Sequence, residues 1–278
     1  MLIALKRDLF SAPSTGVASP FIHVSALMRP LLGLVSVLLL LLLGASPALA
    51  GNPSRDAVVH LAHGVQLDRR ALRDALGQPP AAGSEAASND VAILLWLQNF
   101  RTPEMEANTW LFLDRNPVLF SRALGVDMVK QTPLIHAGVM AFVKPLDTVM
   151  GEFKRQVGRP RPYLQDSRIH PCLPREDSGS YPSGHSTWYR ASAELLADLI
   201  PERRERLLAV GDHGGAARTV CGVHFPSDVD AGQRLGAAGA RLLMATPQWR
   251  AFRNDPGVQA ELQKLKQVPA ESLPMLTR

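Results

Sequence analysis

Helical periodicity dominates the chain after residue 50, and this feature limits the folds that the chain can adopt. Runs of β-branched residues are scarce, no Asn-Gly hairpin turn occurs, and strand and helix patterns do not alternate. Apolar residues instead recur at helical spacing, as in the amphipathic segment 186–200, which stops before Pro201. The pattern predicts an all-α fold with a single helical domain. The predicted helices cover residues 56–76, a segment that starts at Asp90, and residues 104–115, 117–130, 133–152, 186–200, 202–215, 226–245 and 247–268.

Three of these segments carry more specific expectations. Asp90 is predicted to cap the helix that follows it, because a carboxylate at that position accepts hydrogen bonds from free N–H groups. Pro145 is predicted to break or bend the helix over 133–152. The helix over 202–215 is predicted to end at its glycines.

The first 50 residues do not follow the helical pattern of the rest. Residues 28–50 combine one Arg, an apolar run of about 13 residues and the small-residue end Ala-Leu-Ala, which is the layout of a secretory signal peptide. The run is short for a membrane span, which needs about 20 residues, and an uncleaved anchor stays the alternative. Residues 1–27 fit no part of this layout, so either Met28 is the true start, which we favour, or the leader is extended. Residues 51–278 are then the mature domain, periplasmic or secreted and without stable membrane insertion.

Charge and cysteine content narrow the class of protein further. The 278-residue chain carries a net charge of +5, of which residues 51–278 retain about +3, and no long run of like charge indicates a nucleic-acid partner. Two cysteines, Cys172 and Cys221, in an exported chain suggest a disulfide. Closing that loop of about 49 residues stabilises a fold by roughly 4 kcal/mol in the chain-entropy model. Two reduced, buried thiols are the alternative.

The first chemically distinctive segment is KRQVGRPRPY, residues 154–163. It places Lys154, Arg155, Arg159 and Arg161 at the end of a predicted helix. Clustered Lys and Arg suit a phosphate or a carboxylate, because guanidinium groups bind pairs of oxygens. A solvated basic helix end is the simpler interpretation of this segment alone.

The second segment is GSYPSGH, which directly precedes a predicted helix. Free N–H groups at a helix start form an anion site, which Gly184 leaves open to close approach and to which Ser183 can donate its hydroxyl. His185 at the edge of such a site can give or take a proton. The alternative is an ordinary helix cap, Ser183, beside an incidental histidine.

The third segment is ARTVCGVHFPSDVD, residues 217–230. His224 and Asp228 flank Pro226, which suits the first position of a helix. A carboxylate that accepts from one imidazole nitrogen leaves the other nitrogen free as a nucleophile. Arg218 lies upstream, and the alternative is that His224 and Asp228 are ordinary polar residues at a helix start. The remaining histidines of residues 51–278 have no comparable surroundings and are predicted to be structural or surface residues: His60, His63, His136, His170 and His213.

Motifs for other chemistries are missing from the sequence. No His-x-x-x-His, His-Glu-x-x-His or Cys-x-x-Cys spacing occurs, and no Gly-x-Ser-x-Gly elbow is present. Cationic groups with two histidines and an acid indicate phosphoryl chemistry without a metal, in which positive side chains stabilise the developing charge.

Together the three segments resemble the signature of the phosphatidic acid phosphatase type 2 superfamily, which includes the vanadium haloperoxidases. The resemblance is closer to the class A bacterial non-specific acid phosphatases, on the segments GSYPSGH and CGVHFPSDVDAG, and it covers residues 75–268. The matching positions are Lys154, Arg161 and Pro162, then Pro182, Ser183, Gly184 and His185, then Arg218, His224 and Asp228.

The resemblance implies a role for each matching residue. His224 would attack phosphorus and become a phosphohistidine, with Asp228 orienting it, and His185 would protonate the leaving alcohol and then activate water. The phosphoryl oxygens would be held by Lys154, Arg161, Arg218, Ser183 and the Gly184 N–H. The family is all-α and metal-independent, and a disulfide in relatives matches Cys172–Cys221.

The resemblance also implies the activity and leaves alternatives open. It implies an acid phosphatase that hydrolyses small phosphomonoesters without a cofactor and that vanadate inhibits as a phosphate mimic. The alternatives are a vanadate-dependent haloperoxidase, a soluble lipid-phosphate phosphatase and a weakly catalytic phosphate-binding protein. The sequence leaves homo-oligomerisation open. One departure is Ala217, where the family has serine, so we expect roughly tenfold weaker phosphate binding for want of that hydroxyl.

Overall fold

The computed structural model describes residues 55–276, and every regular element in this part of the chain is a helix. The signal peptide expected at 28–50 and the segment 1–27 lie outside the described residues. The longer helices are α3 (Arg69–Leu76), α4 (Glu85–Phe100), α5 (Pro103–Leu111), α8 (Pro133–Val157), α10 (Gly184–Leu199), α11 (Arg204–Val220), α12 (Pro226–Met244) and α14 (Pro256–Lys266). Shorter elements are α2 (Arg55–Leu61), η1 (Pro117–Phe120), α6 (Ser121–Leu124), α7 (Met128–Gln131), α9 (Pro162–Gln165), η2 (Pro201–Arg203), α13 (Pro247–Arg253) and η3 (Ala270–Ser272).

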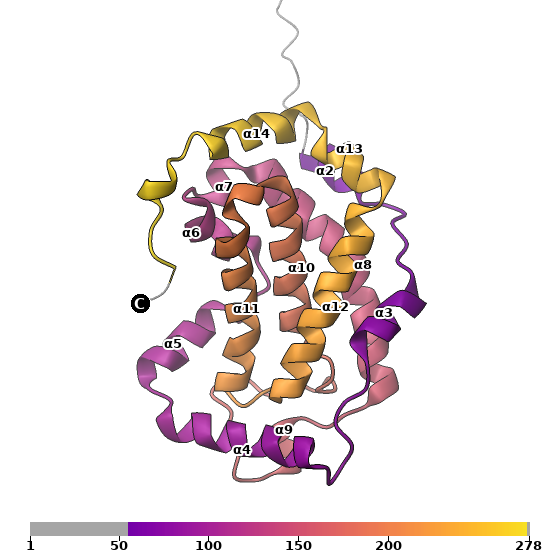
Figure 1. Cartoon of the computed structure of the whole chain (residues 1–278), viewed down its shortest axis with the longest axis vertical. Helices are drawn as coiled ribbons and strands as arrows, with labels where there is room; N and C mark the ends of the chain where they lie inside the picture. The colour runs from indigo at the N-terminus through magenta and orange to yellow at the C-terminus, as the bar shows by residue number, and fades with distance from the viewer. Residues whose placement is uncertain (1–54, 277–278) are drawn as a thin grey trace, which may run out of the picture. The chain divides into compact units, whose positions relative to one another are not determined.

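The centre of the bundle is α10, which packs against α11, α12 and α8 (Figure 1). Small residues let these helices approach closely. A Cβ added at Gly232 would lie 2.6 Å from the Ser183 carbonyl oxygen, and one at Gly236 would lie 2.5 Å from that of Thr187. Any larger residue at either glycine of α12 would therefore push α12 away from α10.

Chain direction brings four helix ends together. Helices α8 and α11 end, and α10 and α12 begin, at the end of the bundle that α4 and α9 cover (Figure 1). Helix C-termini usually attract cations, whereas N-termini offer N–H groups to anions. This end of the bundle thus combines side chains from all three chemically distinctive segments.

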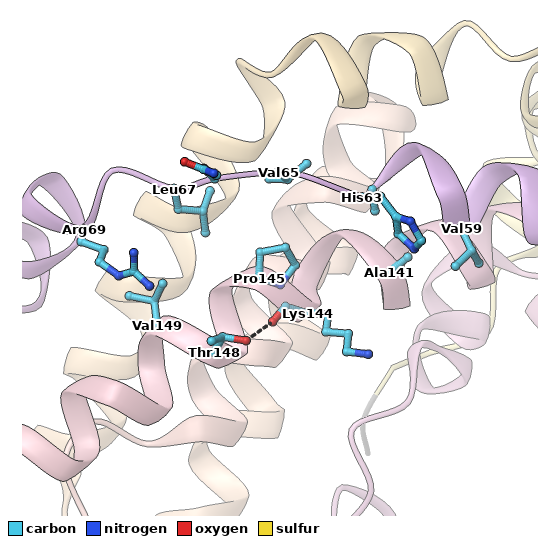
Figure 2. Close-up of a pocket in the computed structure, with 12 residues that line it drawn as sticks. Val59, His63, Val65, Leu67, Arg69, Ala141, Lys144, Pro145, Thr148 and Val149 are labelled. Carbon is cyan, nitrogen blue, oxygen red and sulfur yellow. Dashed lines mark hydrogen bonds between the residues drawn. The ribbon is translucent and has the colours of Figure 1, made fainter.

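Pro145 lies inside α8, where the sequence predicts a break or a bend. The helix continues past it from Pro133 to Val157. Pro145 and Thr148 line a hollow of about 610 Å³ between α8 and the segment that joins α2 to α3, and the Thr148 hydroxyl lies 3.4 Å from the Lys144 carbonyl oxygen (Figure 2). An open side of the helix accommodates the proline ring without ending the helix.

Glycines account for three differences from the predicted helices. Segment 56–76 contains two helices, since Gly64 adopts a positive φ of 72° between them. Segment 117–130 contains η1, α6 and α7, and Gly125, also at 72°, ends α6 and separates it from α7. The expected end of a helix at the glycines of 202–215 is wrong, because α11 continues to Val220. Gly214 and Gly215 make close contact with α10 instead: Cβ atoms there would meet Tyr189 and Ser186 within 3 Å.

Candidate active site

The structure gathers the predicted site residues at the shared helix ends. Lys154 lies in the last turn of α8 and Arg218 in the last turn of α11, while His185 belongs to the first turn of α10. His224 lies two residues before α12, whose first turn carries Asp228. The side chains of His224 and Asp228 are almost completely buried. The three sequence segments therefore form one site.

The His224 imidazole is held between an acid and a guanidinium group. Its Nδ1 lies 3.5 Å from Oδ2 of Asp228, and its Nε2 lies 2.9 Å from NH1 of Arg161. A guanidinium group only donates, so Nε2 accepts and the proton is assigned to Nδ1, on the side of Asp228. Burial and the neighbouring cations, Arg161 first among them, lower the pKa of His224 well below its usual range. The imidazole is neutral, with a nucleophilic lone pair on Nε2.

Asp228 is fixed by donors from three directions. Oδ2 accepts from the Phe225 N–H at 2.9 Å and from the Ser180 hydroxyl, and Oδ1 accepts from NH1 of Arg159 at 2.6 Å. Burial raises the pKa of Asp228, whereas the charge of Arg159 lowers it. Arg159 therefore favours the ionised form that orients His224.

Arg159 belongs to a second buried cluster, which brings in Asp90. NH2 of Arg159 lies 2.9 Å from Oδ2 of Asp90, and Asp90 also accepts from the N–H and the hydroxyl of Ser227. The expectation that Asp90 caps a helix is wrong. Ser84 caps α4, and Asp90 lies inside that helix with its side chain turned toward Arg159. Its role depends on a partner 69 residues away, which no local pattern indicates.

The three predicted cations are deeply buried. Arg161 and Arg218 are each 1% exposed and Lys154 is 7% exposed. Loss of water, and then the charge of Arg161, lower the pKa of Lys154 to about 7, and burial lowers that of Arg218 to about 10. Nε and NH1 of Arg218 have no hydrogen-bond partner in the described part of the chain. Buried, incompletely paired cations are unfavourable, so this arrangement fits an anionic ligand. We call Lys154, Arg161, Arg218 and the start of α10 the anion site.

A carboxylate that the sequence patterns did not indicate lies on this anion site. Glu176 accepts from NH2 of Arg161 at 2.6 Å and from NH2 of Arg218. Burial raises the pKa of Glu176, but the charges of Arg161 and Arg218 outweigh this effect, so the net shift is downward and the carboxylate is ionised. Glu176 belongs to no motif, and its loop position carries no signal of the contact.

The start of α10 has the form that the sequence predicts for GSYPSGH. Ser183 is the N-cap, and its hydroxyl accepts from the Ser186 N–H at 3.4 Å. A Cβ at Gly184 would lie 3.1 Å from Cε of Met150 and 3.7 Å from Cε of Lys154, so the glycine keeps α10 close to the lysine. This geometry is compatible with both interpretations of Ser183, as an ordinary helix cap and as part of the anion site, because the capped helix start belongs to that site.

His185 lies at the edge of the site. Its Nε2 is 2.8 Å from the Leu113 carbonyl oxygen, to which it must donate, so a lone pair remains on Nδ1 of the neutral ring. Burial and the charge of Arg218 lower its pKa to about 3. His185 is therefore neutral above that pH, and a bound dianion would raise its pKa.

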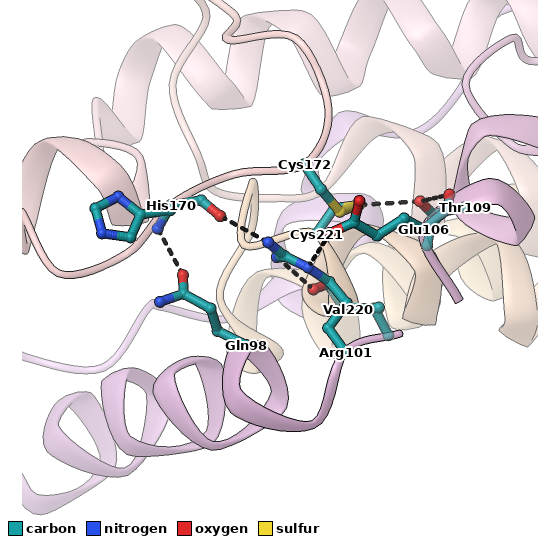
Figure 3. Close-up of a disulfide and its surroundings, with 8 residues drawn as sticks. All are labelled: Gln98, Arg101, Glu106, Thr109, His170, Cys172, Val220 and Cys221. Atoms are coloured by element: carbon teal, nitrogen blue, oxygen red, sulfur yellow. Dashed lines mark hydrogen bonds and ion pairs between the residues drawn. A yellow bond between two sulfur atoms is a disulfide. The ribbon is translucent and has the colours of Figure 1, made fainter. Parts of the chain in front are cut away.

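The disulfide Cys172–Cys221, which the sequence predicts, is present (Figure 3). It joins the loop after α9 to the residue that follows α11, three positions beyond Arg218. Arg101 reinforces this link by donating to the carbonyl oxygens of Val220 at 3.3 Å and His170 at 3.2 Å. The end of α11 is thus tied to the loop that carries Glu176.

Among residues 55–276, no three His, Cys, Asp or Glu side chains are grouped as a metal would require. No helix within that range is long and apolar enough to cross a membrane.

Comparisons with known proteins place the chain in a family. Residues 133–252 match the model of the PAP2 superfamily. A non-specific acid phosphatase of Providencia stuartii is 31% identical over 224 residues, which are 77% of this chain and 85% of that protein. An acid phosphatase of Zymomonas mobilis is 28% identical over 206 residues, 69% of this chain and 75% of that protein. The crystal structure of a transmembrane PAP2 type phosphatidylglycerolphosphate phosphatase from Bacillus subtilis covers 58% of this chain and 86% of its own at 26% identity, with a TM-score of 0.43. On the family match and the Providencia relative, the chain belongs to the PAP2 superfamily.

Proposed function

We propose that this chain is an acid phosphatase that hydrolyses small phosphomonoesters through a phosphohistidine on His224. The observation that carries the proposal is the position of the His224 imidazole, whose Nε2 lies 2.9 Å from NH1 of Arg161 and whose Nδ1 lies 3.5 Å from Oδ2 of Asp228. The lowered pKa of His224 is compatible with a neutral, nucleophilic Nε2. The names of the relatives from Providencia stuartii and Zymomonas mobilis support the same activity.

The first step forms a covalent intermediate. Nε2 of His224 attacks phosphorus, the bond from phosphorus to the ester oxygen breaks, and that oxygen takes a proton from His185 as the alcohol leaves. The imidazole of His224 becomes positively charged, which the carboxylate of Asp228 stabilises. Lys154, Arg161 and Arg218 hold the phosphoryl oxygens.

The second step regenerates the enzyme. His185, now neutral, accepts a proton from water, the water oxygen attacks phosphorus, and the bond from phosphorus to Nε2 breaks. His185 must be charged for the first step, although its pKa in the free site is about 3. A bound phosphomonoester dianion raises that pKa, and this requirement is compatible with activity on the acid side of neutrality.

The chemistry as proposed uses side chains in place of a metal. The anion site supplies the positive charge, so turnover of p-nitrophenyl phosphate at acidic pH should persist in EDTA. Vanadate should bind the same residues and inhibit. A requirement for an added metal ion would contradict this mechanism.

We infer that residues 51–278 form the catalytic domain of an exported, periplasmic or secreted enzyme. The disulfide supports this inference, since disulfides persist in oxidising compartments. Sequencing the N-terminus of the protein recovered after export tests it, with cleavage after Ala50 expected.

Trapping the intermediate is the decisive experiment. Acid-quenched enzyme with a phosphomonoester should carry a phosphoryl group on His224, detected by mass spectrometry. His224→Ala should lose both the adduct and turnover, whereas His170→Ala, in the loop before the disulfide, should keep them. An adduct on another residue, or turnover by His224→Ala, would overturn the proposal.

A further inference from the structure

The Glu176 carboxylate lies on the anion site, where the proposed mechanism places the phosphoryl group. It bridges Arg161 and Arg218, which are each 1% exposed, whereas its own side chain is 35% exposed. Carboxylates and phosphoryl groups offer guanidinium nitrogens the same feature, oxygens that accept charge-assisted hydrogen bonds. Glu176 therefore occupies the anion site with a group from the chain itself.

Arg161 has no donor to spare while Glu176 is in place. Its Nε donates to the Ser178 carbonyl oxygen, and NH1 donates to the Val223 carbonyl oxygen and faces Nε2 of His224. NH2 donates to Glu176 and to the Ser178 hydroxyl, so all five N–H groups are engaged. A phosphoryl group near Nε2 needs donors from this guanidinium, and release of Glu176 provides them. A carboxylate that stayed would also repel the incoming dianion.

The position of Glu176 allows its side chain to leave without moving the loop. Its backbone is fixed by Tyr163, whose hydroxyl donates to the Glu176 carbonyl oxygen at 3.1 Å and accepts from the Glu176 N–H at 3.0 Å. A hollow of about 450 Å³ adjoins the residue, and Arg155 and Arg175 line it. Rotation of the side chain would carry the carboxylate from buried cations to more exposed ones.

We propose that Glu176 is a built-in competitor of the substrate, which holds the anion site in the free enzyme and swings aside when a phosphoryl group binds. The inference rests on the proposed function and adds an affinity-determining residue to it. Glu176 pairs the buried arginines while the site has no ligand, and every phosphoryl ligand is bound more weakly because it must displace the carboxylate.

Binding of inorganic phosphate to purified variants tests the proposal. In Glu176→Gln, which keeps the shape and removes the charge, the dissociation constant for phosphate should fall roughly tenfold, equivalent to about 1.4 kcal/mol. Asp177→Asn makes the same chemical change at the next residue, which is exposed, and should leave the constant unchanged. Phosphate should also raise the melting temperature of Glu176→Gln by more than that of the wild type.

The outcomes separate this inference from the proposed function. If the wild type binds phosphate and turns over p-nitrophenyl phosphate but Glu176→Gln binds no tighter, Glu176 is a fixed ion pair and the inference alone fails. If neither protein binds phosphate and the wild type shows no turnover, both proposals fail. Should Glu176→Gln not fold, a crystal structure of the wild type with phosphate decides. If Glu176 has moved away from both arginines in that structure, the inference is supported. If Glu176 is still bound to them, the inference is overturned.

Discussion

Arg159 donates to Oδ1 of Asp228 at 2.6 Å and thereby fixes the carboxylate that we propose orients His224. Its guanidinium also lies 4.1 Å from the centroid of the Phe225 ring, and its other terminal nitrogen binds Asp90. The arginine never reaches the ligand side of His224. In the proposed mechanism it is a positioning residue, which acts through Asp228.

Replacing Arg159 with Gln should therefore affect both folding and the pH profile. The change leaves the buried carboxylates of Asp228 and Asp90 uncompensated, which costs about 3–5 kcal/mol in the free energy of unfolding. The pKa of Asp228 rises further without that charge, so kcat on the acid side should begin to fall at a higher pH than in the wild type. Urea denaturation and kcat against pH measure the two effects.

Arg155→Gln is the matched control for this prediction. Arg155 is exposed in the last turn of α8, close in sequence to Arg159, and its loss should change neither quantity. If Arg159→Gln is less stable but keeps the wild-type pH profile, Arg159 has only a structural role.

The lowered pKa of Lys154 leads us to expect that anion binding depends on pH. Its pKa is lowered from 10.5 to about 7 by burial and the charge of Arg161, so its ammonium group is charged below that pH and neutral above it. Binding of sulfate, which keeps both charges across this range, should weaken roughly tenfold between pH 6 and pH 8 as that charge is lost. The pKa of His224 and that of His185 lie below this window.

Inhibition by sulfate at several pH values checks the assignment to Lys154. In Lys154→Gln sulfate should bind more weakly at pH 6 and with little change up to pH 8. Lys144→Gln removes an exposed lysine of the same helix and should retain the wild-type slope. The same slope in Lys154→Gln would mean that another group titrates.

The disulfide should stabilise both the fold and the end of α11. The bond closes a loop with a sequence separation of 49 residues, so the double change Cys172→Ser with Cys221→Ser should cost about 4 kcal/mol in the free energy of unfolding. The dissociation constant for phosphate should also rise, because Arg218 lies in the last turn of α11, which the disulfide holds in place. Arg101→Gln keeps the disulfide but loses the hydrogen bonds beside it and the ion pair with Glu106, and it should show a smaller loss of stability. Equal stability of the double variant and the wild type would contradict the prediction.

Local sequence patterns predicted much of the fold and the helix starts that carry the proposed site residues. The turn GSYPSGH before a helix, and His224 and Asp228 on either side of Pro226, are features of helix starts, which neighbouring residues encode. The all-α class followed from periodicity for the same reason. Glycines were misread in α11, because a glycine that ends a helix and one that allows helix contact look alike in a sequence.

The rest of the site depends on contacts between distant parts of the chain. Asp90 bonds Ser227 across 137 residues, and Glu176 reaches Arg218 across 42. Neither pairing has a local pattern, because it arises only when α4 and the loop before α10 are packed onto the bundle. Arg159 belongs to the basic segment 154–163. Its neighbours in sequence do not show whether it binds Asp228 or a ligand.

The last prediction concerns Ala217, which precedes Arg218 and is buried in the last turn of α11. Replacing it with Ser should strengthen phosphate binding roughly tenfold if the new hydroxyl donates to the ligand. The exposed neighbour offers the control, since Ala216→Ser adds the same hydroxyl outside the site and should change nothing. Inhibition constants of phosphate, measured for both variants and the wild type, show whether the added hydroxyl strengthens phosphate binding. An unchanged constant in Ala217→Ser would show that the hydroxyl bonds the preceding turn of α11 instead, and that the anion site does not need it.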